Sequence, residues 1–435
     1  MSKDKLTDYD SSTASNNTDV GGISVAEGML PSAVNNSLRE LTKQLGAFAD
    51  GTDGIDVLSL ADDDASHAIK LQAPSAVTAD TTFTFPDGDG TADQVLKTDG
   101  SGQLGWVAQT AVASNPSLII NGGMTVSQRG TSFANPSDDN YTLDRIHVFN
   151  SNDGAATITQ ATIVPNDEVF YKSIKFDCTT LDGTIAAGQY LSFNQRIEGL
   201  NNAVLGFGES DAKSITVSFY AKSNLTGTFC YAVRNSATDR AYIKEFSLAS
   251  ANTWERISFT IPGDTSGTWL TTNGIGAIHG ISLSMGSTYH GTANQWNTSN
   301  VVATSNQVNF LSSTDNEFFL TGWKVEIGSA ATPFEHRSYG DELARCQRYF
   351  TTWNAGWSGV SEGAGYQQTS TVSFPVQMNH TPDIARTGGT SSTRYPSSNF
   401  LAFYRNADGF TANVTAATAG GNESWQATGT ADSEL

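Results

Sequence analysis

The sequence predicts a mainly β protein with a short amino-terminal helix, a β-rich stalk, a jelly-roll sandwich and a small carboxy-terminal β domain. Charged residues make up only 16% of the 435 residues, 41 glycines interrupt the chain, and alternating apolar and polar residues fill its second half. Low charge, frequent turn residues and period-2 alternation are typical of antiparallel β proteins. We expect four regions, at residues 1–50, 51–114, 115–339 and 340–435.

The charge balance argues against several classes of partner. The chain has 24 Lys and Arg against 44 Asp and Glu, a net charge of −20, which repels nucleic-acid phosphates and anionic membranes. Its apolar runs are shorter than the roughly 18 residues of a membrane span, so we expect no membrane insertion. Three widely spaced cysteines, Cys178, Cys230 and Cys346, predict no disulfide framework and fit assembly in a reducing cytoplasm.

The first region predicts a tail followed by a helix. Residues 1–22 are rich in Ser, Thr, Asn, Asp and Gly, and such a segment orders only when a partner supplies apolar surface. Ser24 and Glu27 have the spacing of a capping box, and Pro31 suits a first helical turn. We therefore expect a docking tail and then a helix that ends before Gly51.

The predicted helix carries an apolar seam at alternating spacings of four and three residues, which is the pattern of a short coiled coil. The seam consists of Val34, Leu38, Leu41, Leu45 and Phe48. Because the sequence that follows is acidic loop and not domain core, the seam predicts self-association in a bundle. Packing of the seam onto a different partner is the alternative.

The second region predicts a narrow stalk. Between Asp50 and Asp99 the chain has eleven Asp, two Lys and no Glu or Arg, which gives −9 of the total charge. Its apolar pieces, such as residues 57–60 and 104–107, are each too short to build a core alone. Several chains wound together could bury them.

The third region predicts one antiparallel sandwich or jelly roll, because long alternating segments are divided by Gly, Asn, Asp and Ser turns. The expected strands are 156–164, 173–177, 189–197, 214–223, 228–234, 242–248, 254–262, 277–285 and 317–327. Trp323 lies inside the last of these and is expected in the core. In the fourth region we expect a helix at 340–350, then strands at 370–378, 400–404 and 424–427.

Several motifs resemble the tail fibres of tailed bacteriophages. The motifs are ISVAEG (23–28) and NNSLREL (35–41) at the helix, IKLQAP (69–74) and FPDGDGTADQVLKTDGSGQLGW (85–106) in the stalk, LIINGGM (118–124), QRG (128–130) and YTLDR (141–145) at the start of the sandwich, and WKVEIG (323–328), ATPFE (331–335) and ELARCQRYF (342–350) at its close. The sandwich module of such fibres is similar to carbohydrate-binding modules. The resemblance covers nearly the whole chain.

The resemblance implies a homotrimeric fibre of the virion tail, with receptor recognition as its task. Residues 1–50 would anchor it on a virion tail or adaptor protein, and its distal part would attach to a host surface polysaccharide. The terminal domain would be the distal tip. A non-adhesive tail or collar structural protein remains an alternative, and a polysaccharide depolymerase is another.

Motifs for catalysis, metals and cofactors give little support to an enzyme. Residues 359–363 match G-x-S-x-G, but a nucleophile elbow needs an acid and then a histidine downstream, and here His380 precedes Asp383. The six histidines show no metal-binding spacing. We therefore expect no catalytic residues, no metal and no cofactor, and interpret 359–363 as a surface loop.

Aromatic residues in turn-rich segments are the candidate ligand-binding residues, because sugars stack on exposed rings and loops carry binding sites. The candidates are Trp269, Tyr289 and Trp296 in the sandwich, and Trp353 and Trp357 in the terminal region. Trp296 is the first choice for a stacking platform. The alternatives are packing against the sandwich and, for the terminal pair, a trimer contact. The charge of −20 predicts a neutral or cationic polysaccharide, bound without cleavage.

Overall fold

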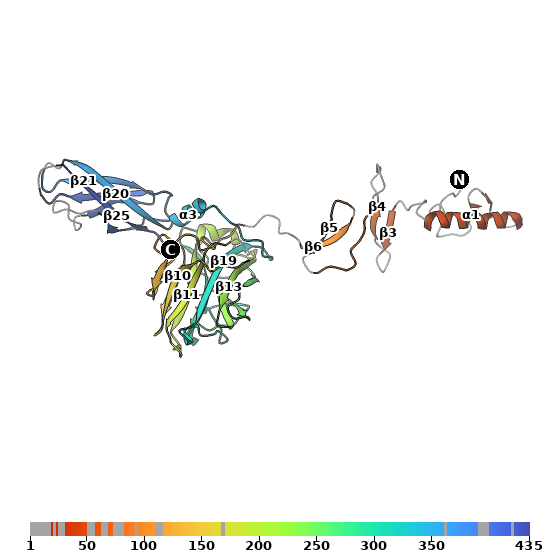
Figure 1. Ribbon diagram of the computed structural model, residues 1–435, viewed down its shortest axis with the longest axis horizontal. Coiled ribbons are helices and arrows are strands. Elements are labelled where there is room, and N and C mark those ends of the chain that lie inside the picture. The colour runs from red at the N-terminus through yellow and green to blue at the C-terminus, as the bar shows by residue number, and fades with distance from the viewer. Residues whose placement is uncertain are drawn as a thin grey trace. The chain divides into compact units, whose positions relative to one another are not determined.

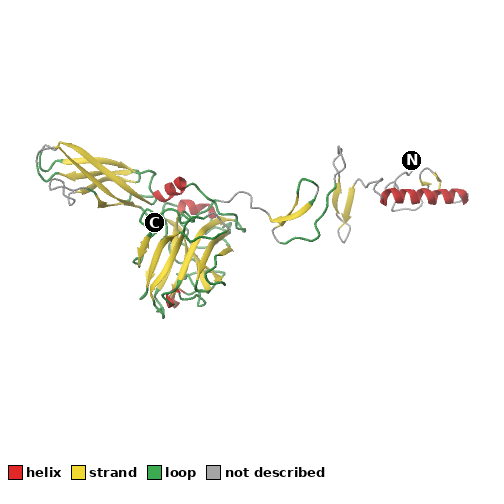
Figure 2. Cartoon of the chain, in the orientation of Figure 1, coloured by secondary structure: helices red, strands yellow, loops and turns green. Residues whose placement is uncertain are grey.

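The computed structural model describes residues 19–20, 23–24, 31–49, 57–61, 68–72, 82–91, 94–101, 103–108, 116–166, 170–360, 363–389, 400–418 and 422–435. The chain divides into two compact units, Met1–Thr110 and Ala111–Leu435. Both are rich in strands, as Figure 2 shows, and the prediction of a mainly β protein is confirmed. Among the described residues, no helix is both long and apolar enough to cross a membrane.

In the first unit the predicted helix is present as α1 (Pro31–Ala49; Figure 1), after a short antiparallel pair of β1 (Asp19–Val20) and β2 (Ile23–Ser24). Most of the predicted tail, residues 1–22, lies outside the described residues. The helix leaves much of its seam open to solvent within the chain: Val34 is 43% exposed, Leu38 58% and Leu45 47%, whereas Leu41 is half-buried. The side chain of Phe48 is not among those described.

The predicted stalk contains two antiparallel hairpins, β3 (Val57–Ala61) with β4 (Ala68–Gln72), and β5 (Gln94–Thr98) with β6 (Leu104–Ala108). Trp106 of β6 donates its indole N–H to the Gly88 carbonyl, which holds the preceding loop against the ring. Apolar side chains of this second hairpin and of the segment before it remain exposed in the single chain: Phe83 (57%), Phe85 (67%), Val95 (41%), Leu96 (40%), Trp106 (36%) and Val107 (38%).

The second unit contains the predicted sandwich, made of two antiparallel sheets. The six-stranded sheet has the order β16-β13-β19-β11-β10-β7, and the seven-stranded sheet has the order β18-β15-β14-β17-β12-β9-β8. Figure 1 shows β13, β19, β11 and β10 side by side. The bounds are β7 Ser132–Ala134, β8 Asn140–Tyr141, β9 His147–Ser151, β10 Ala155–Ala161, β11 Ser173–Thr180, β12 Tyr190–Glu198, β13 Ile215–Ser223, β14 Gly227–Arg234, β15 Ala241–Leu248, β16 Glu255–Ile261, β17 Ile275–Met285, β18 Trp296–Asn297 and β19 Glu317–Ile327.

The core of the sandwich lies between the two sheets and is dominated by aromatic rings. Phe176 stacks on Phe193 with ring centroids 4.7 Å apart, and Trp323, which is 0% exposed as predicted, contacts Phe193 edge-on at 6.0 Å. Each predicted sandwich strand overlaps an observed one, because alternation places every second side chain in this core. Short helical segments lie between strands at α2 (Gly199–Asn202), η3 (Ala203–Leu205), η4 (Ser287–Tyr289) and η5 (Phe310–Ser312).

The terminal region begins with α3 (Tyr339–Gln347), which ends earlier than the helix predicted at 340–350. Two three-stranded sheets follow, in the orders β20-β25-β22 and β21-β24-β23. Three predicted strands overlap β21, β23 and β25, whereas β20, β22 and β24 were not predicted. Their bounds are β20 Phe350–Val360, β21 Gln367–Ser373, β22 Asp383–Gly388, β23 Phe400–Asn406, β24 Gly409–Thr415 and β25 Asn422–Asp432.

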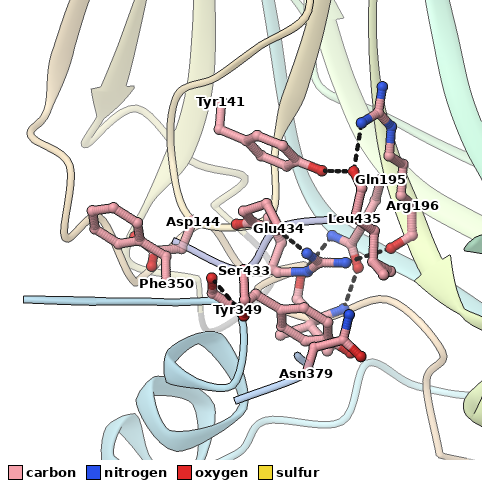
Figure 3. A network of polar contacts seen from close by, with 12 residues as sticks. Tyr141, Asp144, Gln195, Arg196, Tyr349, Phe350, Asn379, Ser433, Glu434 and Leu435 are labelled. Carbon is pink, nitrogen blue, oxygen red and sulfur yellow. Dashed lines mark hydrogen bonds and ion pairs between the residues drawn. The ribbon is translucent and has the colours of Figure 1, made fainter. Parts of the chain in front are cut away.

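A buried polar network joins the sandwich to the terminal strands (Figure 3). Glu198, at the end of β12, accepts hydrogen bonds from Arg348 at 2.9 and 2.6 Å and from the Tyr349 hydroxyl at 2.8 Å. Arg145 pairs with Glu434, and its guanidinium lies 3.6 Å from the centroid of the Tyr349 ring. These contacts hold Arg348 and Tyr349, which precede β20, and Glu434, which follows β25, against one end of the sandwich.

Candidate functional site

Trp269 lies in the sandwich core and not on a binding surface. Its side chain is 6% exposed, its ring contacts Phe207 edge-on at 4.9 Å, and its indole N–H donates to the Ser266 carbonyl at 3.2 Å. The interpretation of Trp269 as a sugar platform is therefore corrected: this ring closes one end of the core.

Trp296, the first choice for a platform, is half-buried and packs beside Trp269. Its ring lies 5.6 Å from Trp269 and 5.3 Å from Tyr242, and its indole N–H donates to the Pro262 carbonyl at 3.1 Å. The residue belongs to β18, the short edge strand that pairs with β15. These contacts assign the ring a packing role.

The terminal pair also faces inward. Trp353 is 4% exposed, stacks on Phe400 at 5.5 Å and donates its indole N–H to the Thr430 carbonyl at 3.0 Å. Trp357 is half-buried and packs against the same core. Because period-2 alternation within β20 directs both rings to the buried face, they do not form an exposed platform.

Tyr289, by contrast, lines an open cavity. The cavity has a volume of about 270 Å³ and lies on the outer face of the seven-stranded sheet. We call it the sheet groove. The side chains that matter for its chemistry are Phe149, Tyr190, Tyr289, Arg196, Arg234 and Asn300.

Strand register explains why these residues meet. Arg196 of β12 and Arg234 of β14 both pair with Ile278 of the intervening strand β17. Directly paired residues of antiparallel strands project to the same face, so the two arginines flank Ile278 in one row. The adjacent residues Ile197 and Val233 point the other way, into the core.

Aromatic rings form the other part of the sheet groove. Tyr190 contacts Tyr289 edge-on at 5.3 Å and Phe149 edge-on at 6.4 Å, and its hydroxyl donates to Asp138 at 2.9 Å. Phe149 lies under both arginines, 5.6 Å from Arg196 and 5.7 Å from Arg234. The groove therefore combines apolar ring surface with fixed hydrogen-bond donors, which is the composition of a small-ligand site.

The two arginines differ in their partners. Arg196 pairs with Asp139 at 2.7 Å and also donates to the Leu435 main-chain oxygen. Arg234 donates to the side-chain oxygen of Asn300 at 2.6 Å, and no carboxylate among the described residues forms an ion pair with it. Burial, together with the nearby Arg196 charge, lowers the pKa of Arg234 to about 10.

No motif in the sequence points directly to Phe149, Tyr190, Arg196 or Arg234. A signal existed in the alternation of the predicted strands, where Ser192 and Arg196 mark a polar outer face. Which strands become neighbours cannot be read from that pattern, because β17 inserts between β12 and β14 from a later part of the chain.

The structure adds little on catalysis or metals. Ser361 and Glu362 of the predicted 359–363 loop lie outside the described residues, and His380 is exposed. Among the residues that the structure describes, no group of three His, Cys, Asp or Glu side chains is placed to hold a metal ion. The three cysteines are buried and unpaired.

No protein-family model and no curated protein matches the chain. Among solved structures, the enzymatically active domain of bacteriophage CBA120 tailspike protein 4 is 12% identical with a TM-score of 0.26, over 49% of this chain and 21% of that one. A family 11 carbohydrate-binding module from Clostridium thermocellum, in complex with a mixed-linked tetrasaccharide, is 11% identical with a TM-score of 0.23, over 47% and 98%. Discoidin II from Dictyostelium discoideum is 10% identical with a TM-score of 0.17, over 63% and 86%. These TM-scores are too low to establish a shared fold.

Proposed function

We propose that the chain is an adhesive fibre subunit that binds carbohydrate in the sheet groove and does not cleave it. The observation that carries the proposal is the convergence of Phe149, Tyr190 and Tyr289 with Arg234 and Asn300 around one open cavity. Sugar rings present apolar C–H faces and hydroxyl groups, so ring surface beside fixed donors and acceptors suits them. The groove lies on the sandwich, so we place glycan binding there and not on the terminal domain.

The combined variant Tyr190→Ala, Tyr289→Ala is expected to weaken glycan binding by about tenfold or more, because central aromatic residues dominate the energy of small binding sites. Binding is measured with the purified protein on a glycan array, and unfolding is followed in parallel to show that the sandwich is intact. The control is Tyr171→Ala, which removes a 70% exposed tyrosine outside the groove and should leave binding unchanged.

The array also separates the alternative functions. A non-adhesive tail or collar protein would bind no glycan in either form. A polysaccharide depolymerase would shorten the bound polysaccharide on incubation, which chromatography detects. Truncation after Tyr339 is a poorer test, since it would remove Glu434 and Arg348 and leave Arg145 and Glu198 without their partners.

The fibre part of the proposal concerns assembly. We propose that α1 joins three copies of the chain through its apolar seam, with the stalk hairpins wound together beyond it. The exposed Val34, Leu38 and Leu45, and the exposed apolar side chains of the second hairpin, support the proposal because a second copy would remove them from water. The tail-fibre motifs favour three copies, anchored through residues 1–50 on a virion tail or adaptor protein.

Replacement of Leu38, Leu41 and Leu45 by Ser is expected to convert the assembled protein to smaller species. The seam is short, so loss of three of its five apolar side chains removes most of the area that would hold the copies together. Light scattering coupled to size exclusion measures the mass. The matched control replaces the exposed polar residues Asn36, Arg39 and Lys43 of the same helix by Ser and should leave the mass unchanged. A wild-type protein with the mass of one chain would contradict the proposal.

A further inference from the structure

Arg234 lines the sheet groove and, unlike Arg240 and Arg348, forms no ion pair with a carboxylate among the described residues. Arg240 makes two hydrogen bonds to Asp264, at 2.7 and 2.6 Å, and Arg348 makes two to Glu198. Among the described residues, Arg234 has the neutral Asn300 as its side-chain hydrogen-bond partner. The half-buried guanidinium faces an open cavity with no carboxylate beside it, so the missing counter-ion points to an anionic ligand.

A buried polar group without a hydrogen-bond partner lines a small cavity together with Arg234. Asn194 of β12 is 2% exposed, and neither atom of its side-chain amide has a hydrogen-bond partner among the described residues. It pairs with Gly280 of β17, where a Cβ would lie 2.9 Å from the Asn194 Cβ. Asn194 and Arg234 line the same small cavity, of about 10 Å³, and that cavity shares Ser192, Arg234 and Ile278 with the sheet groove.

We propose that the sheet groove selects an acidic sugar, with the sugar carboxylate held by the Arg234 guanidinium. This inference rests on the proposed carbohydrate binding and specifies its ligand. The planar fork of arginine matches the two oxygens of a carboxylate, and the charge on both groups strengthens the hydrogen bonds. The rings of Tyr190 and Tyr289 would pack against the sugar face, and the unpartnered Asn194 amide lines the small cavity beside Arg234.

The proposal reverses the neutral or cationic ligand expected from the net charge of −20. Much of that charge belongs to the first unit, where residues 50–99 contribute −9. Screening limits the reach of each charge to about 10 Å at moderate ionic strength, so the residues that line the groove matter more than the net charge. Arg196 is paired with Asp139, so the uncompensated charge of Arg234 decides which ligand the groove accepts.

The test compares acidic glycans with the same glycans after reduction of their carboxyl groups. The probes are polygalacturonate, hyaluronan and sialylated oligosaccharides, each beside its carboxyl-reduced form, bound to the full chain. We expect at least one acidic probe to bind, and its reduced form to bind about tenfold to hundredfold more weakly, which is the range for loss of a hydrogen-bonded charge.

Variants assign the preference to Arg234. Arg234→Met should abolish the difference between acidic and reduced probes, and Arg234→Lys should keep a smaller difference. Asn300→Asp changes an exposed residue and places a carboxylate beside Arg234, so it should also abolish the preference even if Arg234→Met melts early. The control Arg256→Met, at an exposed position of the six-stranded sheet, should bind as the wild type does.

The outcomes are distinguishable. If acidic and reduced probes bind equally well and the tyrosine variant loses both, the acidic-sugar inference is overturned and carbohydrate binding stands. If an acidic preference survives both Arg234→Met and Asn300→Asp, Arg234 is not the carboxylate site. If no glycan binds the wild type in the probe set or on the array, both proposals are overturned.

Discussion

Glu434→Gln is expected to lower the free energy of unfolding of the second unit by about 3–5 kcal/mol, the usual cost of leaving one member of a buried ion pair without its partner. The side chain of Arg145 is 1% exposed and that of Glu434 is 4% exposed, so water cannot replace the lost carboxylate. The Tyr349 ring on the other side of Arg145 offers only a weaker cation–π contact. Denaturant unfolding measures the change.

Two further variants make this test specific. The double variant Arg145→Met, Glu434→Gln should be more stable than Glu434→Gln alone, because it removes the unpaired charge. Arg405→Met breaks an exposed pair with Asp383, 3.7 Å apart, and should cause no measurable change. A loss below about 1 kcal/mol for Glu434→Gln would show that water or another group reaches Arg145.

Acidification from pH 6.5 to 4 is expected to cost about 3 kcal/mol of stability through His279 alone, at about 1.4 kcal/mol for each pH unit. The imidazole is 0% exposed, and burial lowers its pKa to about 3. Between that value and the ordinary pKa of 6.5, the unfolded chain binds a proton that the folded chain does not. The free energy of unfolding therefore falls as the pH falls through this range.

The measurement is denaturant unfolding at several pH values between 7 and 4. His279→Gln should flatten the dependence, whereas the same substitution at the exposed His380 should not. Burial also lowers the pKa of His147, to about 4, so a smaller slope of the same sign should remain in His279→Gln. An unchanged slope in that variant would exclude His279 as its source.

The sandwich could be predicted because apolar and polar residues alternate along its strands. The same alternation predicts that Trp323 lies in the core. The strand β20 was missed although Trp353, Ala355 and Trp357 alternate in it, since Gly and Thr between them are typical of loops as well. The helix predicted at 340–350 includes Phe350, which is the first residue of β20. Local sequence there supports both structures, and pairing with β25 decides between them.

The binding residues were harder to predict, because exposure depends on contacts between distant segments. Trp269 and Trp296 lie in turn-rich sequence, yet both rings pack on Phe207. Arg234 is unremarkable in a single strand. Its proposed role in ligand binding depends on two features that a single sequence does not display. The strand order brings it near Arg196, and no carboxylate among the described residues forms an ion pair with it.

The pairing of Arg145 with Glu434 also bears on how the chain is made. The last strand of the sandwich, β19, ends at Ile327. The carboxylate that neutralises Arg145 belongs to Glu434, which follows Arg145 by 289 residues in the sequence. A ribosome releases the sandwich strands before it adds Tyr349 and Glu434, so the nascent sandwich lacks both the ring and the carboxylate that Arg145 contacts in the folded chain. Chains cut short before Glu434 leave Arg145 without its carboxylate, so we expect them to fold less stably than chains that include it.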